Sequence, residues 1–369
     1  MSSNARPRRA SVLLPAVALA CSLGCRRTAR SDETSGARAS DEDAAVLASD
    51  APEDALGDAS TSVDVLDAQR ARDAAPPPRL AIVDECAMPK RADPATLRIE
   101  WGAVYATIGA ESLRLDVASP RTEGAHPLVV LIHGGAWAGG ERSLHRDDML
   151  RLAGLGYVAA TIDYRLTSAP DHAFPAAISD VRCSLRWLRQ NAERLAIDPA
   201  RVAVMGLSAG GHLAALAALA GNDVGEGAAS LDEGCASSDQ PATVSAGVSF
   251  YGPTDLREER RYPASLKTAV RAFLAGDPAT YSARAALASP VTHVDADDPP
   301  VLVLHGDADR MVPVEDSRQL AAALAEAKVP SLYVEMPKLP HGFLLFGDGA
   351  VLRRSMCTTL AFLDATLRR

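Results

Sequence analysis

The sequence lacks any long apolar run. Among its 369 residues, no uninterrupted apolar stretch reaches the roughly 18 residues that a membrane-spanning helix needs. Its six cysteines include no CxxC pair, so the usual cysteine spacing of a structural zinc site is absent as well. We therefore expect no membrane-spanning helix in the mature chain and no metal site.

Aromatic residues are absent between residues 26 and 78, where Ala, Ser, Asp and Thr dominate. Such a stretch buries too little apolar surface to offset the entropy lost on ordering. It holds twelve acidic residues against six arginines, and it contributes much of the formal net charge of -9. We predict a disordered acidic tether over residues 25–90. This charge balance argues against nucleic-acid binding.

The first residues have the layout of a signal peptide. Three arginines precede an apolar run from Val12 to Ala20, and small residues then precede two cysteines, Cys21 and Cys25. Both cysteine contexts resemble the bacterial lipobox, in which the cysteine is lipidated; the alternative is an ordinary cleaved signal with incidental cysteines. We favour Cys25, because it leaves the longer apolar segment, and expect residues 1–24 to be a lipoprotein-type signal peptide. The protein would then be exported and anchored to a membrane in the cell envelope or on the cell surface.

Strand-like and helix-like segments alternate from about Leu97 onward. Short apolar or β-branched runs predict strands, and apolar residues at three- and four-residue steps predict helices around 178–188 and 320–327. This alternation favours a mostly parallel sheet with helices on both faces, in one domain over residues 91–369. Ligands of such sheets bind beyond the carboxyl ends of the strands. The strands are expected at 97–108, 113–118, 128–132, 157–162, 202–205, 246–250, 301–304 and 331–336.

A serine lies at a sharp strand-to-helix junction. The segment Gly206-Leu207-Ser208-Ala209-Gly210 follows an expected strand and precedes an Ala/Leu-rich helical stretch. The pattern G-x-S-x-G occurs by chance in chains rich in small residues, but this context is the one that a nucleophile elbow requires. Glycine neighbours allow the crowded turn that projects the serine hydroxyl. We predict Ser208 as a nucleophile in an α/β-hydrolase fold.

A glycine pair follows an earlier buried strand, in His133-Gly134-Gly135-Ala136-Trp137. Successive glycines let backbone N–H groups approach a developing oxyanion. The simpler alternative is a glycine-rich turn without such a function, but hydrolases of this fold place the oxyanion hole at this position. We predict that Gly134, Gly135 and Ala209 donate the N–H groups of the hole.

Two later turns carry the partners that a nucleophilic serine requires. The serine needs a base to take its proton, and the base needs an acid to orient it, in the chain order Ser, Asp, His. The turns are His305-Gly306-Asp307-Ala308-Asp309 and Pro340-His341-Gly342-Phe343, and both follow expected strands. We predict His341 as the base and Asp307 or Asp309 as the acid. Such acyl-transfer chemistry needs no cofactor.

The other histidines and cysteines are given structural interpretations. We expect His133 and His305, in turns at strand ends, to hydrogen-bond to the backbone, and His212 to pack near the serine turn. Four cysteines follow the tether's apolar-poor part, and in an exported protein they permit disulfides with three possible connectivities. These cysteines are Cys86, Cys183, Cys235 and Cys357.

Several motifs in the right order resemble the bacterial esterases related to bifunctional feruloyl and acetyl-xylan esterases, near the hormone-sensitive-lipase group. The resemblance covers about 97–369 and not the tether. In that family the acid is the aspartate of an HGxxD turn followed by Val-Pro, which here selects Asp309. One departure is Leu207, where relatives often carry an acidic residue. The motifs are Asp163-Tyr164-Arg165-Leu166, Phe174-Pro175-Ala176-Ala177, Asp198-Pro199-Ala200-Arg201-Val202, the stretch from Gly206 to His212, and Pro340-His341-Gly342-Phe343.

The resemblance implies a serine carboxylic ester hydrolase that acts on short-chain or carbohydrate-linked acyl esters through an acyl-enzyme. An amide or peptide hydrolase, formamidase-like or peptidase-like, could use the same triad, although peptidase relatives usually carry a propeller domain for which the first ninety residues lack length and strands. A catalytically silent surface binding protein is the alternative from another class. We expect the loops 221–241 and 257–263 to line the alcohol pocket.

Overall fold

The computed structural model describes residues 79–169, 172–220, 239–275, 278–343 and 349–368. The expected signal peptide with Cys21 and Cys25, the tether up to residue 78, and Cys235 lie outside the described residues. Within the described part, no helix is both long enough and apolar enough to cross a membrane.

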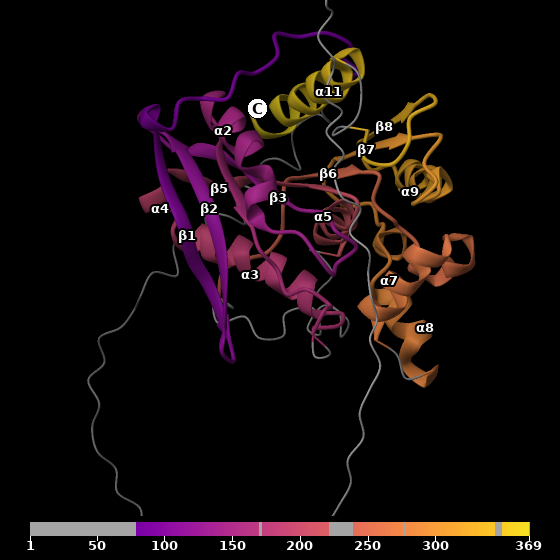
Figure 1. Ribbon diagram of the computed structural model, residues 1–369. Coiled ribbons are helices and arrows are strands. Elements are labelled where there is room, and N and C mark those ends of the chain that lie inside the picture. The colour runs from indigo at the N-terminus through magenta and orange to yellow at the C-terminus, as the bar shows by residue number, and fades with distance from the viewer. Residues whose placement is uncertain (1–78, 170–171, 221–238, 276–277, 344–348, 369) are drawn as a thin grey trace, which may run out of the picture. The chain divides into compact units, whose positions relative to one another are not determined.

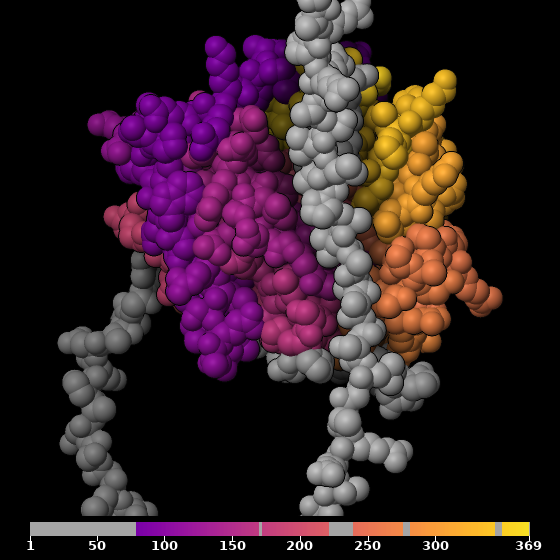
Figure 2. All heavy atoms as spheres, viewed as in Figure 1, coloured from indigo at the N-terminus to yellow at the C-terminus, as the bar shows by residue number. Residues whose placement is uncertain are grey.

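An eight-stranded sheet with the order β1-β2-β4-β3-β5-β6-β7-β8 organises the described residues (Figure 1). Strands β1 and β2 form an antiparallel hairpin, β2 pairs antiparallel with β4, and the remaining neighbours are parallel. The outermost strands β1 and β8 belong to segments that lie on opposite sides of the view in Figure 2, in indigo and yellow. The strands are β1 (Leu97–Ile108), β2 (Glu111–Pro120), β3 (His126–Ile132), β4 (Val158–Ile162), β5 (Ile197–Leu207), β6 (Ala246–Phe250), β7 (Val301–Gly306) and β8 (Ser331–Met336).

Helices cover both faces of this sheet. Side chains alternate along a strand, so Val130 and Ile132 of β3 pack with helices α3 and α5, whereas Val129 and Leu131 pack with α2 and α11. From Pro127 to Ile132, β3 is buried and apolar, because neither face of this part of the strand meets water. The helices are α2 (Arg146–Gly154), α3 (Ala176–Gln190), α4 (Ala192–Leu195), α5 (Ala209–Leu219), α7 (Ala264–Leu274), α8 (Pro278–Leu287), α9 (Val314–Glu326) and α11 (Gly349–Leu367), with short 3-10 turns η1 (Pro94–Thr96), η2 (Arg142–His145), η4 (Leu256–Arg261) and η5 (Pro290–His293).

The expected sheet is confirmed in its strands. The ranges 97–108, 246–250 and 331–336 have the bounds that the sequence pattern indicated. Strand β5 is longer than expected, because its pairing with β3 begins at Ile197, beyond the apolar run 202–205.

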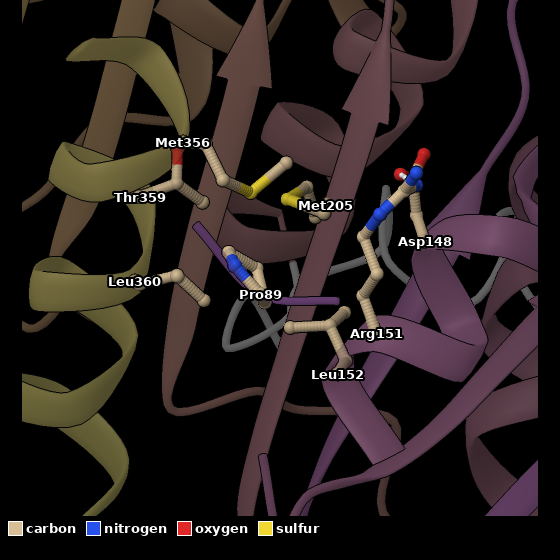
Figure 3. A pocket seen from close by; sticks show the side chains of 8 residues that line it. All are labelled: Pro89, Asp148, Arg151, Leu152, Met205, Met356, Thr359 and Leu360. Atoms are coloured by element: carbon tan, nitrogen blue, oxygen red, sulfur yellow. Dashed lines mark hydrogen bonds and ion pairs between the residues drawn. The ribbon is translucent and has the colours of Figure 1, made fainter. Parts of the chain in front are cut away.

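Residues 79–92 form an extended strap along α11 and α2, although the tether was expected to reach residue 90. Cys86 is disulfide-bonded to Cys357 of α11, and the N–H of Val83 donates to Thr358 Oγ1 at 3.0 Å. Pro89 lies between α2 and α11, where it lines a small, mainly apolar pocket (Figure 3). The ordered domain therefore begins closer to the N-terminus than the composition indicated.

The Cys86–Cys357 disulfide selects one of the three connectivities that the four cysteines permit. It joins residues 271 positions apart, so it closes nearly the whole domain into one loop. In the chain-entropy model, closing such a loop lowers the entropy of the unfolded chain and thereby stabilises the folded protein by about 5 kcal/mol. Cys183, buried on α3, is not a free thiol either.

Candidate active site

Ser208 lies between β5 and α5 with left-handed backbone angles, φ 55° and ψ -120°. The glycines around it are required by space. A Cβ at Gly206 would lie 2.1 Å from the Gly210 carbonyl oxygen, and a Cβ at Gly210 would lie 2.1 Å from the Ile132 carbonyl oxygen. Any larger residue at either position would push the helix away from the sheet, so the strained turn depends on both glycines.

His341 reaches Ser208 from the turn that follows β8. Its Nε2 lies 3.0 Å from Ser208 Oγ, and its Nδ1 lies 2.6 Å from Asp309 Oδ2. The ring also packs edge-on against Tyr251, with 4.8 Å between ring centroids. About a quarter of the His341 side chain is exposed, at 23%, so a substrate can approach the Ser208–His341 pair.

Asp309 is held by the turn that carries it. Its Oδ1 accepts hydrogen bonds from the backbone N–H groups of Met311 at 2.7 Å and Val312 at 2.9 Å. Burial favours the neutral carboxyl, but the hydrogen bonds from His305 and His341 outweigh it and hold the pKa of Asp309 well below its usual range. The carboxylate is therefore charged at every pH at which the protein would work.

Asp307, the other candidate acid, points elsewhere. It is exposed, and its Oδ1 accepts a hydrogen bond from the backbone N–H of Lys338 in the turn after β8. Its own N–H donates to the Met336 carbonyl at 3.1 Å. The structure thus brings Asp309, and not Asp307, into contact with His341.

The glycine pair after β3 lies against the serine turn. A Cβ at Gly134 would lie 2.7 Å from the Leu207 carbonyl oxygen and 3.3 Å from Ser208 Cβ. In the part of the chain that the structure describes, the N–H groups of Gly134, Gly135 and Ala209 donate to no other group. Ala209 is the first residue of α5, where an unpaired N–H is expected of any helix. The three N–H groups are therefore available to an oxyanion near Ser208.

Trp137, for which the sequence indicated no function, anchors this glycine-containing loop. It is fully buried with φ 57°, its ring stacks on Phe273 at 4.6 Å, and its Nε1 donates to His212 Nδ1 at 3.2 Å. His212 Nε2 in turn donates to the Ala288 carbonyl at 2.6 Å, and burial lowers the pKa of His212 to about 4. The neutral imidazole, one turn after Ser208, ties the loop to α5.

The two histidines at strand ends differ from one another. His133 Nδ1 lies 2.8 Å from the Gly134 carbonyl oxygen, and the ring stacks on Tyr164 at 4.3 Å. His305 contacts the Val312 carbonyl oxygen at 3.0 Å, as expected, but also Asp309 Oδ2 at 3.2 Å. The second contact was not expected from the sequence, although the four-residue spacing from His305 to Asp309 could have indicated it.

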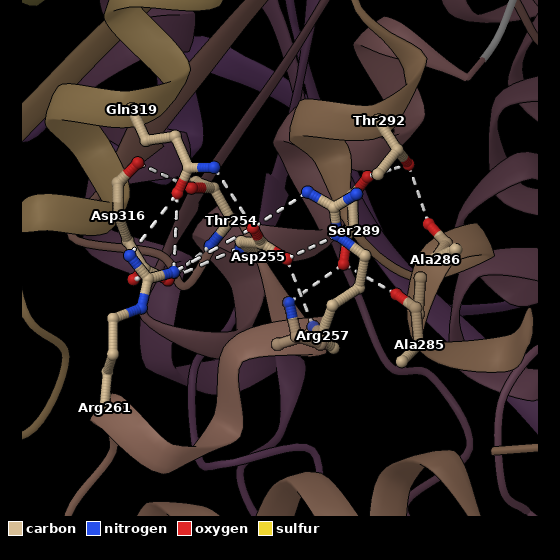
Figure 4. A network of polar contacts seen from close by, with 12 residues as sticks. Thr254, Asp255, Arg257, Arg261, Ala285, Ala286, Ser289, Thr292, Asp316 and Gln319 are labelled. Atoms are coloured by element: carbon tan, nitrogen blue, oxygen red, sulfur yellow. Dashed lines mark hydrogen bonds and ion pairs between the residues drawn. The ribbon is translucent and has the colours of Figure 1, made fainter. Parts of the chain in front are cut away.

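A polar network holds the segment after β6 against α9 (Figure 4). The Thr254 N–H donates to Asp316 Oδ2 at 2.9 Å, and Gln319 Nε2 donates to Asp255 Oδ2 at 3.1 Å. Asp255 also pairs with Arg257, which lies in the loop expected to line the alcohol pocket. Since α9 directly follows the Asp309 turn, this network also fixes the start of that helix. Residues 221–238 of the other expected loop lie outside the described residues.

Comparisons of sequence show relatives among esterases. The probable carboxylic ester hydrolase LipM of Mycobacterium tuberculosis is 37% identical over 230 residues, which are 61% of this chain and 51% of that protein. Esterase LipC of the same organism is 37% identical over 233 residues, 61% of this chain and 54% of that protein. The chain spans about half the length of these relatives.

Solved structures agree with the sequence relatives, and the expected α/β-hydrolase fold is confirmed. A truncated form of a carbohydrate esterase from gut microbiota matches with a TM-score of 0.59 and 25% identity over 75% of this chain and 99% of that one. A thermophilic esterase of Thermogutta terrifontis matches with a TM-score of 0.60 and 27% identity over 74% of this chain and 93% of that one. The BD-FAE family matches residues 115–324, more than half of the sequence, and this chain belongs to the BD-FAE family.

Proposed function

We propose that the protein is a serine carboxylic ester hydrolase that cleaves short-chain or carbohydrate-linked acyl esters through an acyl-enzyme. The observation that carries this proposal is the continuous hydrogen-bonded chain from Ser208 Oγ through His341 to Asp309. The three residues follow β5, β8 and β7, at the carboxyl ends of parallel strands where ligands of such sheets bind. The family and the esterases among its relatives support the same chemistry.

In the acylation step, Ser208 Oγ attacks the ester carbonyl carbon while His341 Nε2 takes the hydroxyl proton. The carbonyl oxygen gains negative charge and is stabilised by the N–H groups of Gly134, Gly135 and Ala209. Collapse of the tetrahedral intermediate breaks the bond to the alcohol oxygen, and His341 gives its proton to that oxygen. Asp309 stabilises the imidazolium formed between the two transfers.

In the deacylation step, a water molecule replaces the alcohol. His341 takes a proton from the water, whose oxygen attacks the acyl carbon, and the second intermediate collapses to release the carboxylic acid. The proton returns to Ser208 Oγ, so the protein ends in its starting state. Amide hydrolysis would use the same steps, so the test of the nucleophile must include amide substrates as well as esters.

Ser208→Ala is expected to reduce kcat for ester hydrolysis by at least about 10³-fold, because the nucleophilic oxygen is lost. The melting temperature should change little, since the hydroxyl is partly exposed and contributes little to packing. Acetyl, butyryl and feruloyl esters and matched amides should be assayed with the wild type and the variant. Residual activity above a few per cent would rule out Ser208 as nucleophile, and faster amide than ester turnover would favour the amidase alternative.

Asp309→Asn and Asp307→Asn form a matched pair that tests the acid. An Asn at 309 has no negative charge to stabilise the His341 imidazolium. We therefore expect kcat to fall by about 10²–10⁴-fold, which corresponds to a loss of roughly 3–5 kcal/mol of transition-state stabilisation. The Asp307 side chain accepts a hydrogen bond from the Lys338 backbone N–H in the turn after β8, so its variant should lose less than about tenfold, chiefly through stability. Steady-state kinetics of both variants decide the assignment. The reverse ranking would make Asp307 the acid.

We propose a preference for short acyl chains. Helix α5 after the serine is buried along its whole length, so it cannot serve as a lid over an extended chain. Solved structures of Thermogutta terrifontis esterase 2 with propionate and with butyrate bound support small acyl groups. We expect a higher kcat/KM for a C4 than for a C12 ester of the same alcohol, with Ser208→Ala as the blank. Faster turnover of the C12 ester would contradict this preference.

We also propose that the protein is exported and anchored to a membrane through lipid on Cys25. The support comes from the sequence alone: a basic segment, a short apolar run and a small residue before cysteine precede a long acidic tether. Two or more acyl chains anchor a protein stably where one does not. Mass spectrometry of the mature N-terminus should find a lipid mass on Cys25, lost in Cys25→Ser and kept in Cys21→Ser. An unmodified N-terminus downstream of Cys25 would refute the anchor.

A further inference from the structure

His305 is a buried histidine in contact with the Asp309 carboxylate. It is the penultimate residue of β7, and none of its surface is exposed. Its Nε2 lies 3.2 Å from Asp309 Oδ2 and 3.0 Å from the Val312 carbonyl oxygen. Its Nδ1 lies 2.6 Å from Ser317 Oγ, on the first turns of α9. The ring therefore fills the space between the Asp309 turn and the following helix.

The neighbours of His305 determine where its proton lies. A carboxylate and a backbone carbonyl can only accept hydrogen bonds, so Nε2, which faces both, must carry hydrogen. Ser317 Oγ can donate or accept, and it donates to Nδ1 when the imidazole is neutral. His305 is thus an Nε2–H donor aimed at Asp309.

Asp309 Oδ2 is shared by two imidazoles. It lies 2.6 Å from His341 Nδ1 and 3.2 Å from His305 Nε2, while Oδ1 accepts from two backbone N–H groups. The four donors come from the Asp309 turn itself, from the end of β7 and from the turn after β8. They prevent rotation of the carboxylate and divide its negative charge among four donors.

We propose that His305 is a positioning residue of the triad: its Nε2–H holds the Asp309 carboxylate toward His341 and limits how strongly that carboxylate stabilises the His341 imidazolium. This inference rests on the proposed ester hydrolase function. A carboxylate that accepts fewer hydrogen bonds is more basic and favours a charged neighbour more. Loss of the His305 donor should therefore keep His341 protonated to a higher pH. Because His341 must be neutral to act as a base, the acidic limb of activity would move upward in pH.

Two other titratable groups, Tyr251 and Glu335, face the imidazoles of His341 and His305, and neither changes its protonation state between about pH 4 and 9. Tyr251 packs against His341, and burial raises the pKa of its phenol. Glu335 of β8 lies beside His305 in the parallel register, and its hydrogen bonds with Arg318 and Tyr333 lower its pKa to about 2. A change in the His341 signal between about pH 4 and 9 therefore does not come from Tyr251 or Glu335.

The test compares three variants with the wild type. His305→Met fills similar space without a donor, His305→Gln keeps an amide N–H near the Nε2 position, and Ser317→Ala alters only the Nδ1 side. The titration midpoint of the low-field Nδ1–H proton resonance of His341 is measured by NMR, and the pH profile of kcat/KM is measured for a butyryl ester. We expect His305→Met to raise both midpoints by about 0.5–1 pH unit. For His305→Gln and Ser317→Ala, we expect both midpoints to stay within about 0.2 pH unit of the wild-type values.

If His305→Met folds and both midpoints equal those of the wild type, the inference about His305 is wrong. The proposed function would still stand in that case, provided that ester hydrolysis depends on Ser208. If the wild type hydrolyses no ester, the proposed function fails, and the NMR titration still decides the coupling between His305 and His341. If His305→Met does not fold, the ¹⁵N shifts of His305 in the wild type decide. A protonated Nε2 supports the inference, and an unprotonated Nε2 refutes it.

Discussion

The close approach of three backbone segments around Ser208 is the constraint on which the site depends. The end of β3, the end of β5 and the start of α5 pack so tightly that a Cβ at Gly206 would lie 2.1 Å from the Gly210 carbonyl oxygen and a Cβ at Gly210 would lie 2.1 Å from the Ile132 carbonyl oxygen. This contact holds Ser208 at φ 55°. Strain of this kind persists only where surrounding packing imposes it. Buried Trp137 provides part of that packing, because it ties the Gly134 loop to α5 through His212.

The charge of the site is organised around Asp309. Four hydrogen-bond donors converge on its carboxylate, which keeps it ionised despite complete burial of the side chain. An imidazolium at His341 would otherwise be costly in so enclosed a place, and the fixed negative charge compensates for it without rearrangement. The turn that carries Asp309 leads into α9, whose first turn is held through Asp316 by the segment after β6. The stability of that distant network and the geometry of the acid are thus physically connected.

Local patterns in the sequence predicted most of the sheet and most residues of the candidate site. Mostly apolar runs such as 246–250 have the same bounds in the structure, because a strand buried on both faces is a near-continuous apolar run. The glycine patterns around Ser208 and after β3 were informative because only glycine fits those contacts. The ordered strap was not predicted, because it has no local sequence pattern of this kind. Residues 79–92 form neither helix nor strand, and they are ordered through partners more than 260 positions away, such as Thr358 and the Cys86–Cys357 disulfide.

The sequence by itself determined the fold class and the residue types of the site, since strand periodicity and steric limits at glycines are local properties. It left Asp307 and Asp309 open until the family resemblance was considered, because two acids in one turn differ only in direction. In the folded chain the two side chains face different partners: Asp307 accepts the Lys338 N–H, and Asp309 faces His341. The disulfide connectivity, the buried contact of Trp137 with His212 and the approach of His305 to Asp309 also required the folded chain. Each of these depends on the distance between separate elements, which no local pattern encodes.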